Sequence, residues 1–196
     1  MKHRQSRLGF RNPELKVSTS KSSKAPNEFE DMNPFQQQKA AKAWHRIGLV
    51  SRIPELENHD GYRMAPKCKA FIIPKDGTSD PQAPEEADLD FSFNLANQVL
   101  VFKYQGKVHA VDHQCPHATF PLSQGKLFDI EDFGIKLSTG LTCPKHGWSF
   151  DIFTGKGDRG NYNLKLWEID LREPSSTVET SDDDKEVWVR PKQRIG

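Results

Sequence analysis

The sequence predicts an all-β fold, a small antiparallel sandwich or barrel, for the part of the chain after about residue 44. Several short runs in this part alternate apolar and polar residues or are rich in β-branched and aromatic residues, and little of it favours helix. The 196 residues are enough for one domain of ~100–200 residues with tails. Hydrophobic residues make up 35%, below the usual ~45–50%, so part of the chain is expected to lie outside the core.

Residues 1–43 are expected to form a disordered basic tail and a short helix, separate from a domain at 44–196. They carry nine Lys/Arg and four Asp/Glu, a net of +5, whereas the remainder carries a net of −4. The run from Lys16 to Lys24 has one apolar residue in nine, too few to offset the entropy of ordering it. Pro34 to Trp44 is compatible with the short helix because proline suits the first turn.

The tail has two interpretations. A basic, Ser-rich and acid-poor N-terminus is also typical of a mitochondrial transit peptide. The apolar residues of the tail form no helical stripe, however, which favours a solvated tail. The expected location is therefore cytoplasmic, with mitochondrial as the alternative.

The first half of the β region begins with a strand, Cys68 to Pro74, that proline ends. Pro74 to Asp90, with several prolines and acids, is expected to be a long polar loop, and Phe91 to Leu95 alternates again. Two β-rich runs, Val99 to Tyr104 and Lys107 to Asp112, flank a short glycine turn and predict a hairpin.

The second half contains further short strands. Leu137 to Thr142 and Trp148 to Phe153 are expected on either side of a Cys/His loop. Leu164 to Leu171 alternates apolar and polar residues, and Glu186 to Arg190 predicts a final strand. Between these two strands, Pro174 to Lys185 predicts a polar connection.

Several classes of protein are excluded at this point. No apolar run approaches the ~18–20 residues of a membrane span, and no apolar signal-peptide core follows Met1. Three cysteines cannot build a disulfide scaffold. A net charge of +1 argues against a strongly basic nucleic-acid binder.

Two loops carry the metal-binding chemistry. Cys115 and His117 lie in one Cys-Pro-His loop, Cys143 and His146 lie in a Cys-Pro-Lys-His loop, and twenty-five residues separate His117 from Cys143. A zinc finger usually pairs its ligands as Cys-Cys and His-His. One thiolate and one imidazole from each loop instead suit a dinuclear centre, with both cysteines on one iron and both histidines on the other. This is the ligand set of a Rieske [2Fe–2S] centre; a mononuclear zinc site is the alternative.

The sequence around these loops resembles the Rieske domain family. Val101 to His117 resembles the hairpin and first cluster loop, Pro121 to Gly125 the turn that follows, and Thr142 to Gly155 the second loop and its return strand. The likeness extends over about residues 65–191 and is strongest to soluble ferredoxin-like members of eukaryotic type. It implies a small antiparallel β domain whose two loops bind a [2Fe–2S] cluster, with these ligands: Cys115, His117, Cys143 and His146.

The gap between the loops is longer than in many bacterial Rieske ferredoxins. We place the excess at Phe128 to Gly134, which we expect to be an acidic turn with two aromatic residues. A similar segment occurs in eukaryotic proteins that resemble this chain.

The other histidines and the third cysteine have simpler expected roles. His113 is expected to be an exposed histidine at a strand end rather than a ligand. His109 alternates with apolar neighbours and is expected at the surface, and Cys68 is expected to be a buried free thiol.

The resemblance also predicts the kind of centre. In members from respiratory bc complexes, a disulfide joins the two loops, but the matching residues here are Phe120 and Lys145. Those proteins also place hydroxyl donors after the second histidine, where this chain has Trp148 and Phe150. Fewer donors to sulfur stabilise the reduced cluster less, so we expect a potential in the lower part of the Rieske range of roughly −150 to +300 mV.

No second catalytic domain is expected. No His or Cys follows His146, whereas a Rieske oxygenase adds a mononuclear iron held by two His and a carboxylate. Gly155 to Gly160 fits the pattern G-x-G-x-x-G, but an alternating strand follows where a dinucleotide site needs a helix. We therefore expect a tight turn there, with Asp158 to Tyr162 covering the cluster from the side.

The predicted function is one-electron transfer by a ferredoxin-like carrier to a protein redox partner, a reductase or an oxygenase. The alternatives are a redox- or iron-sensing interaction module, and an electron-transfer subunit of a larger enzyme. We expect His117 and His146, on the outer iron by analogy, to be the exit for the electron. The acidic segments at 74–90 and 181–184 suit a basic partner, although a run of charge is usually only a solvated face.

Overall fold

The computed structural model describes residues 43–56, 62–65, 67–73, 84–89, 94–174 and 184–193. The elements of this part are strands and three short 3-10 turns, which confirms the all-β prediction. None of its helices is long and apolar enough to cross a membrane. In chain order the elements are β1 (His45–Leu49), η1 (Val50–Arg52), β2 (Glu55–Leu56), β3 (Tyr62–Arg63), β4 (Lys69–Ile72), β5 (Glu85–Ala87), η2 (Leu95–Asn97), β6 (Gln98–Tyr104), β7 (Lys107–Asp112), η3 (Leu122–Gln124), β8 (Lys126–Asp132), β9 (Ile135–Cys143), β10 (Trp148–Asp151), β11 (Trp167–Arg172) and β12 (Glu186–Pro191).

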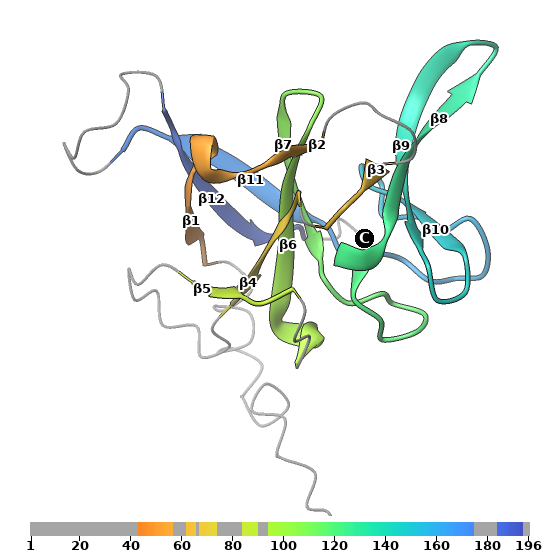
Figure 1. Cartoon of the computed structure of the whole chain (residues 1–196), viewed down its shortest axis with the longest axis horizontal. Helices are drawn as coiled ribbons and strands as arrows, with labels where there is room; N and C mark the ends of the chain where they lie inside the picture. Colours follow the sequence, from red (N-terminus) through yellow and green to blue (C-terminus); the bar gives the residue numbers. More distant parts are fainter. Residues whose placement is uncertain are drawn as a thin grey trace, which may run out of the picture.

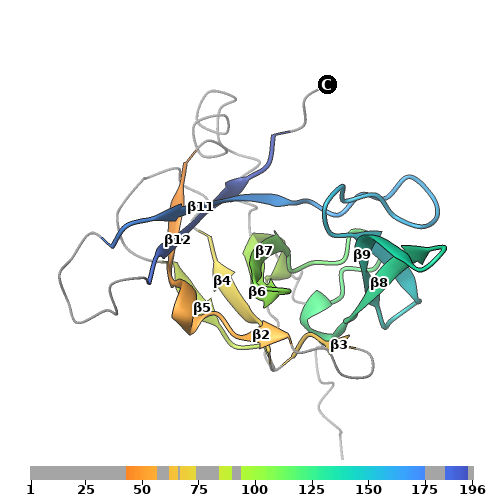
Figure 2. The same cartoon turned by 90° about the horizontal axis from the view of Figure 1, so that it is seen from above.

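The strands form three sheets. The first has the order β1-β12-β11, the second has β10-β9-β8-β3, and the third has β2-β6-β4-β5 with β7 paired to β6. β6 and β7 stand in the middle of the molecule, between β8–β10 on one side and β1, β11 and β12 on the other (Figures 1 and 2). A bridge between Val111 and Leu166 links β7 to the segment that leads into β11.

Strand β6 explains how the layers are held together, because it is buried on both faces. Its residues alternate between two hydrophobic clusters, as the period of two in a strand requires. Val99 and Val101 pack with Val187 and Val189 of β12. Leu100, Phe102 and Tyr104 pack on the opposite side, among residues of the β8–β10 sheet and both Cys/His loops. The near-continuous apolar run of this strand therefore lets β6 contribute to two hydrophobic clusters, one on the side of the β8–β10 sheet and one on the side of the β1-β12-β11 sheet.

The sequence predicted one of two tight hairpins correctly and the other wrongly. The β6–β7 hairpin is confirmed, and its turn residues Gln105 and Gly106 have φ values of 52° and 72°. The expected acidic turn at Phe128 to Gly134 is wrong. Most of it is strand β8, which pairs with β9 from Lys126–Thr142 to Asp132–Ile135, and only residues 133–134 make the turn. The acidic side chains there belong to a strand rather than to a turn: Asp129 is partly buried, and Glu131 and Asp132 are exposed.

A polar cluster fastens this long hairpin to the body. The Tyr104 hydroxyl donates to Asp129, the Lys136 ammonium lies 2.7 Å from Asp129, and it also donates to the Tyr104 oxygen at 3.2 Å. The same ammonium stands 4.5 Å above the Tyr104 ring. Hydrogen bonds from these two donors help lower the pKa of Asp129, even though burial alone would raise it.

Of the other predicted segments, some are confirmed, some differ from the structure, and some lie outside the described residues. The predicted loop at 74–90 contains a short strand, β5, which pairs with β4. In the run Phe91 to Leu95, residues 91–93 lie outside the described residues and Leu95 begins a 3-10 turn. The strand predicted at Glu186 to Arg190 is confirmed, and that at 164–171 is observed from Trp167 to Arg172. The tail, nearly all of the helix predicted at 34–44, and most of the connection at 174–185 also lie outside the described residues.

Candidate metal centre

Three loops meet at the end of the β8–β10 sheet. The first loop (residues 113–125) joins β7 to β8, the second (144–147) joins β9 to β10, and the third (152–166) joins β10 to β11. The two Cys/His loops make matching turns. The Thr119 N–H donates to the Cys115 carbonyl at 3.1 Å, and the Gly147 N–H donates to the Cys143 carbonyl at 3.0 Å. The matching local sequences therefore fold into matching local structures, as their composition suggested.

The two cysteines form a buried pair. Cys115 is 0% exposed and Cys143 is 1% exposed, and their thiols contact each other through a hydrogen bond. The sulfur of Cys143 also accepts the backbone N–H groups of Lys145 and His146. Burial raises the pKa of Cys143, and its contact with Cys115 raises it further, whereas these backbone donors oppose the rise. Two thiols with backbone donors aimed at sulfur are suited to bind a metal as thiolates.

The two histidines form a second pair. The ring centroids of His117 and His146 are 5.1 Å apart, with 73° between the ring planes. His146 is exposed, whereas His117 is partly buried and its Nδ1 atom is buried without a hydrogen-bond partner. Buried ring nitrogens are almost always paired, so an orphaned one beside a second imidazole indicates a missing ligand.

The four donors are arranged as two pairs rather than as one cage. Among the described residues, no three His, Cys, Asp or Glu side chains converge on a point suited to a single metal ion. A tetrahedral zinc site with two Cys and two His needs all four at about 2.0–2.3 Å from one ion. A thiol pair and an imidazole pair are the two kinds of donor that the sequence predicts for two metal ions, one held by each pair.

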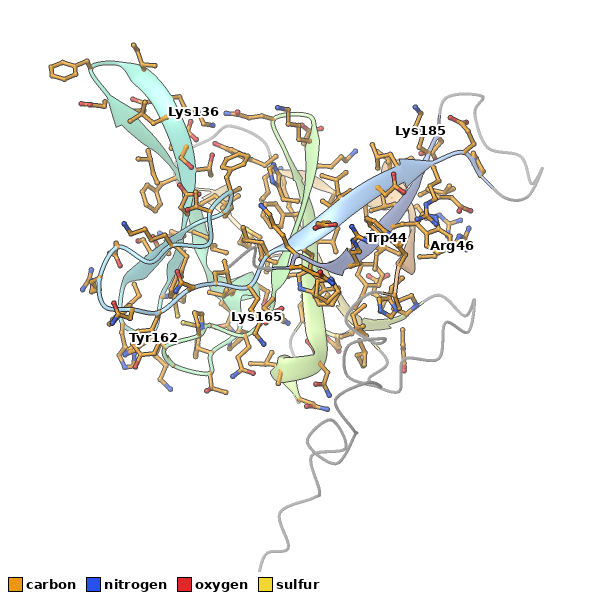
Figure 3. The ribbon with its side chains drawn as sticks, turned by 180° about the vertical axis from the view of Figure 1, so that it is seen from behind. Trp44, Arg46, Lys136, Tyr162, Lys165 and Lys185 are labelled. Atoms are coloured by element: carbon orange, nitrogen blue, oxygen red, sulfur yellow. The ribbon has the colours of Figure 1, made fainter. Side chains whose placement is uncertain are left out.

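Aromatic side chains enclose the histidine pair. Trp148 stacks on His117 with ring centroids 4.2 Å apart, and Tyr162 meets the edge of the same imidazole at 5.2 Å. Trp148 and Tyr162 also contact each other at 5.1 Å. Tyr162 belongs to the third loop, on the side of the molecule away from Trp44 and Arg46 (Figure 3). These rings shield one imidazole from water and leave His146 open.

The third loop is a turn that caps the second loop. The Asp158 N–H donates to the Ser149 carbonyl at 2.9 Å, and the Ser149 N–H donates back to the Asp158 carboxylate at 3.2 Å. The Arg159 guanidinium donates to the Gly147 carbonyl at 3.3 Å. Bridges and bends, not a helix, follow Gly155, so the G-x-G-x-x-G match lacks the context of a dinucleotide site.

His113 is not exposed, contrary to the prediction. It is 0% exposed, and its ring nitrogens lie 2.7 Å from the Gln98 amide oxygen and 2.8 Å from the Ser123 hydroxyl. Its backbone also bonds to Gln98 and Leu122, so this residue ties β6 to both ends of the first loop. Burial lowers the pKa of His113 to about 4, which keeps the imidazole neutral. The sequence offered no spacing that pairs it with Gln98, because that contact depends on the hairpin register.

His109 also differs from its prediction, whereas Cys68 does not. His109 is half-buried, stacks on Phe102 at 5.6 Å and meets the edge of Phe153 at 5.4 Å. Burial lowers its pKa to about 4, with smaller lowering effects from Lys107 and Lys136 and an opposing hydrogen bond to the Tyr104 backbone. Cys68 is a buried free thiol, as predicted, and burial raises its pKa to about 12.

The structure agrees with the absence of a disulfide between the loops. All three cysteines are free, and the Lys145 ammonium lies 5.5 Å above the Phe120 ring. A cation–π contact of this kind links the two loops where the resemblance places a disulfide in other members.

Comparison with known proteins gives a family for the part of the chain that contains both Cys/His loops. Residues 82–166 match the family described as the Rieske [2Fe-2S] domain. The chain contains a Rieske domain. A human Rieske domain-containing protein is 37% identical over 68 residues, which cover 35% of this chain and 40% of that protein. The ferredoxin component of the alkene monooxygenase system of Xanthobacter autotrophicus is 38% identical over 61 residues, or 31% of this chain and 43% of that one.

The chain thus matches less than half the length of each of these relatives. Among solved structures, the ferredoxin of carbazole 1,9a-dioxygenase from Nocardioides aromaticivorans aligns over 77% of this chain and 100% of its own length. Its sequence identity is 18% and the TM-score is 0.43.

A Rieske domain carries a [2Fe–2S] cluster, and the residues described above fit one. The fit rests on the donors: a thiol pair with backbone donors to sulfur, an imidazole pair, and a buried Nδ1 that has no partner within the protein.

Proposed function

We propose that the protein is a one-electron carrier whose [2Fe–2S] cluster is held by Cys115 and Cys143 on one iron and by His117 and His146 on the other. The observation that carries this proposal is the unpartnered, buried Nδ1 of His117 beside the His146 ring. Sulfur ligands on one side and neutral imidazoles on the other are the donor set of Rieske centres. When bound, such a cluster would accept one electron and give it up again reversibly.

The residues of the chain supply the surroundings for this chemistry. Backbone N–H groups of Lys145 and His146 stabilise negative charge on the Cys143 sulfur. Trp148 and Tyr162 exclude water from His117, while His146 faces the solvent and is the proposed contact with a partner. No serine or tyrosine occupies positions 148 and 150, which supports a potential in the lower part of the Rieske range of roughly −150 to +300 mV.

We further propose that the partner is a protein, a reductase or an oxygenase, and that the domain extends over residues 44–196. The name of the Xanthobacter relative, a ferredoxin component of a monooxygenase system, supports this class of partner. The chain then acts as a carrier rather than as a complete enzyme. A sensing module would carry the same ligands, but it would change its affinity for a partner with the state of the cluster.

The test combines spectroscopy with variants. The purified protein is expected to contain two irons and two sulfides per chain and to give, after dithionite, a rhombic EPR signal of low average g. Cys143→Ser should remove the signal, whereas the matched change Cys68→Ser, at a buried thiol that belongs to neither Cys/His loop, should leave it intact. A colourless protein that binds one zinc after anaerobic, iron-supplemented expression would refute the proposal.

A further inference from the structure

The charges of the chain are distributed unevenly around the candidate centre. The segments 113–126, 143–149 and 156–165 surround it, and we call them the centre-side segments. They contain five basic residues and one acidic residue, Asp158, a net of +4. The whole chain has a net charge of +1, so all other residues together carry −3. The basic residues of the centre-side segments are Lys126, Lys145, Lys156, Arg159 and Lys165.

These basic side chains face the solvent. All five residues are exposed, and the side chains of Arg159 and Lys165 are 56% and 79% exposed. Asp158, the single acid, is paired with Arg159 at 3.0 Å. The nearest further acid in sequence, Asp112, lies 3.8 Å from Lys165 but is much less exposed. Burial raises the pKa of Asp112, although its hydrogen bond from Trp167 opposes the rise. The positive charge around the centre is thus only partly neutralised.

The positive groups stand next to the proposed exit for the electron. Lys145 immediately precedes the exposed His146. The Arg159 guanidinium lies 5.7 Å from the centre of the Trp148 ring and bonds to the carbonyl of Gly147. A partner that approaches His146 closely enough to exchange an electron must therefore approach these charges as well.

Most acidic residues of the described part lie outside the centre-side segments. Glu131 and Asp132 are exposed near the tip of the β8–β9 hairpin. On the β1-β12-β11 sheet, the acids are paired with arginines at 2.5–2.9 Å: Arg46 with Glu186, Arg172 with Asp170, and Arg190 with Glu168. Arg46 and Lys185 lie on the side away from Tyr162 in Figure 3. Within the described part of the chain, the excess of positive charge therefore lies in the centre-side segments.

We propose that the centre-side segments form a docking face for a redox protein that presents an acidic surface around its own redox group. The inference rests on the proposed electron-carrier function and specifies its partner. An acidic partner is the opposite of the basic partner that the acidic runs at 74–90 and 181–184 would attract. Charge around the site of contact steers encounter and orients the pair, so it acts chiefly on the association rate and depends on salt.

The experiment measures electron transfer from the reduced holoprotein to two forms of one acceptor by stopped-flow absorption. Native cytochrome c is the basic probe, and fully succinylated cytochrome c, whose lysines carry carboxylates, is the acidic probe. At low ionic strength we expect the second-order rate constant to be about tenfold higher with the acidic probe, and this advantage should vanish in high salt.

Charge-reversal variants locate the effect. The pair Lys156→Glu and Lys165→Glu alters the docking face without touching the ligand loops, and we expect it to abolish or invert the preference. The matched pair Lys107→Glu and Lys185→Glu changes the net charge equally at exposed sites outside the centre-side segments, and it should preserve the preference. The EPR signal of each variant is recorded so that a change in rate is not caused by a damaged cluster.

The outcomes separate the two proposals. Equal rates with both probes, a preference for native cytochrome c, or an equal effect of both variant pairs would overturn the acidic partner. Binding to phosphatidylserine vesicles that only the Lys156→Glu and Lys165→Glu pair abolishes, together with equal rates, would replace it with an anionic membrane. A protein with an intact Rieske signal that reduces neither probe would instead contradict the electron-carrier function itself.

Discussion

Gly155 provides a sharp test of the backbone packing within the third loop. Its φ angle is +77°, and a Cβ atom built on it would lie 2.4 Å from the Leu164 carbonyl oxygen. Its backbone also accepts a hydrogen bond of 2.8 Å from the Leu164 N–H. Gly106, in the β6–β7 turn, has a similar φ angle of +72°, but a Cβ atom there would meet nothing within 4 Å. The two glycines therefore share the backbone strain of a substitution and differ in the space around it.

The expected losses follow from this difference. Placing alanine at a left-handed position costs roughly 1–2 kcal/mol, and Gly106→Ala should lower the free energy of unfolding by that amount alone. Gly155→Ala adds a clash with backbone that no side-chain rotation can relieve, and overpacking costs about 1–3 kcal/mol more. We expect a total near 3–4 kcal/mol for Gly155→Ala.

Urea unfolding of the loaded protein, followed by circular dichroism, measures both variants. With a slope of about 2 kcal/mol per molar urea, the midpoint should fall by about 1.5–2 M for Gly155→Ala and by less than about 1 M for Gly106→Ala. If the two midpoints agree within about 0.3 M, the close approach of Leu164 contributes nothing and the reasoning from this contact is refuted.

Two histidines yield further predictions. His113→Leu removes the hydrogen bonds of the imidazole to the buried Gln98 amide oxygen and the buried Ser123 hydroxyl, at ~1–3 kcal/mol each. Urea unfolding should therefore show a loss near 3 kcal/mol, and a loss below about 1 kcal/mol would contradict the network. The pKa of His109 is lowered to about 4 from an ordinary 6.5. The folded protein therefore protonates His109 only at a lower pH than the unfolded chain does. The contribution of His109 to the free energy of unfolding is therefore fully present above about pH 6.5. It is lost as the pH falls toward 4, by about 1–2 kcal/mol after allowance for the partial exposure of the ring. His109→Phe should flatten the stability profile between pH 6.5 and 4 relative to the wild type, and parallel profiles would show that this ring does not titrate as argued.

The local parts of the structure were predictable from the sequence because short-range rules determine them. The β6–β7 hairpin follows from two β-rich runs around Gln105 and Gly106, and the Cys/His loops follow from their spacing. The burial of His113 was missed because its partners, Gln98 and Ser123, are brought to it by strand register and by the fold of the first loop. Residue type alone favours an exposed histidine, and tertiary hydrogen bonds override that preference here.

The β8–β9 hairpin shows why the error at residues 128–134 did not affect the expected ligands. The pairing of Lys126 with Thr142 returns the chain to the base of the hairpin, one residue before Cys143. Residues inserted between these two positions lengthen the hairpin and do not alter the distance between the two strands at its base. The contacts of Asp129 with Tyr104 and Lys136 stabilise this hairpin part-way along its length. The long gap in sequence is therefore compatible with a compact centre, because the pairing at the base of the hairpin, and not the length of the gap, sets how far the first loop lies from Cys143.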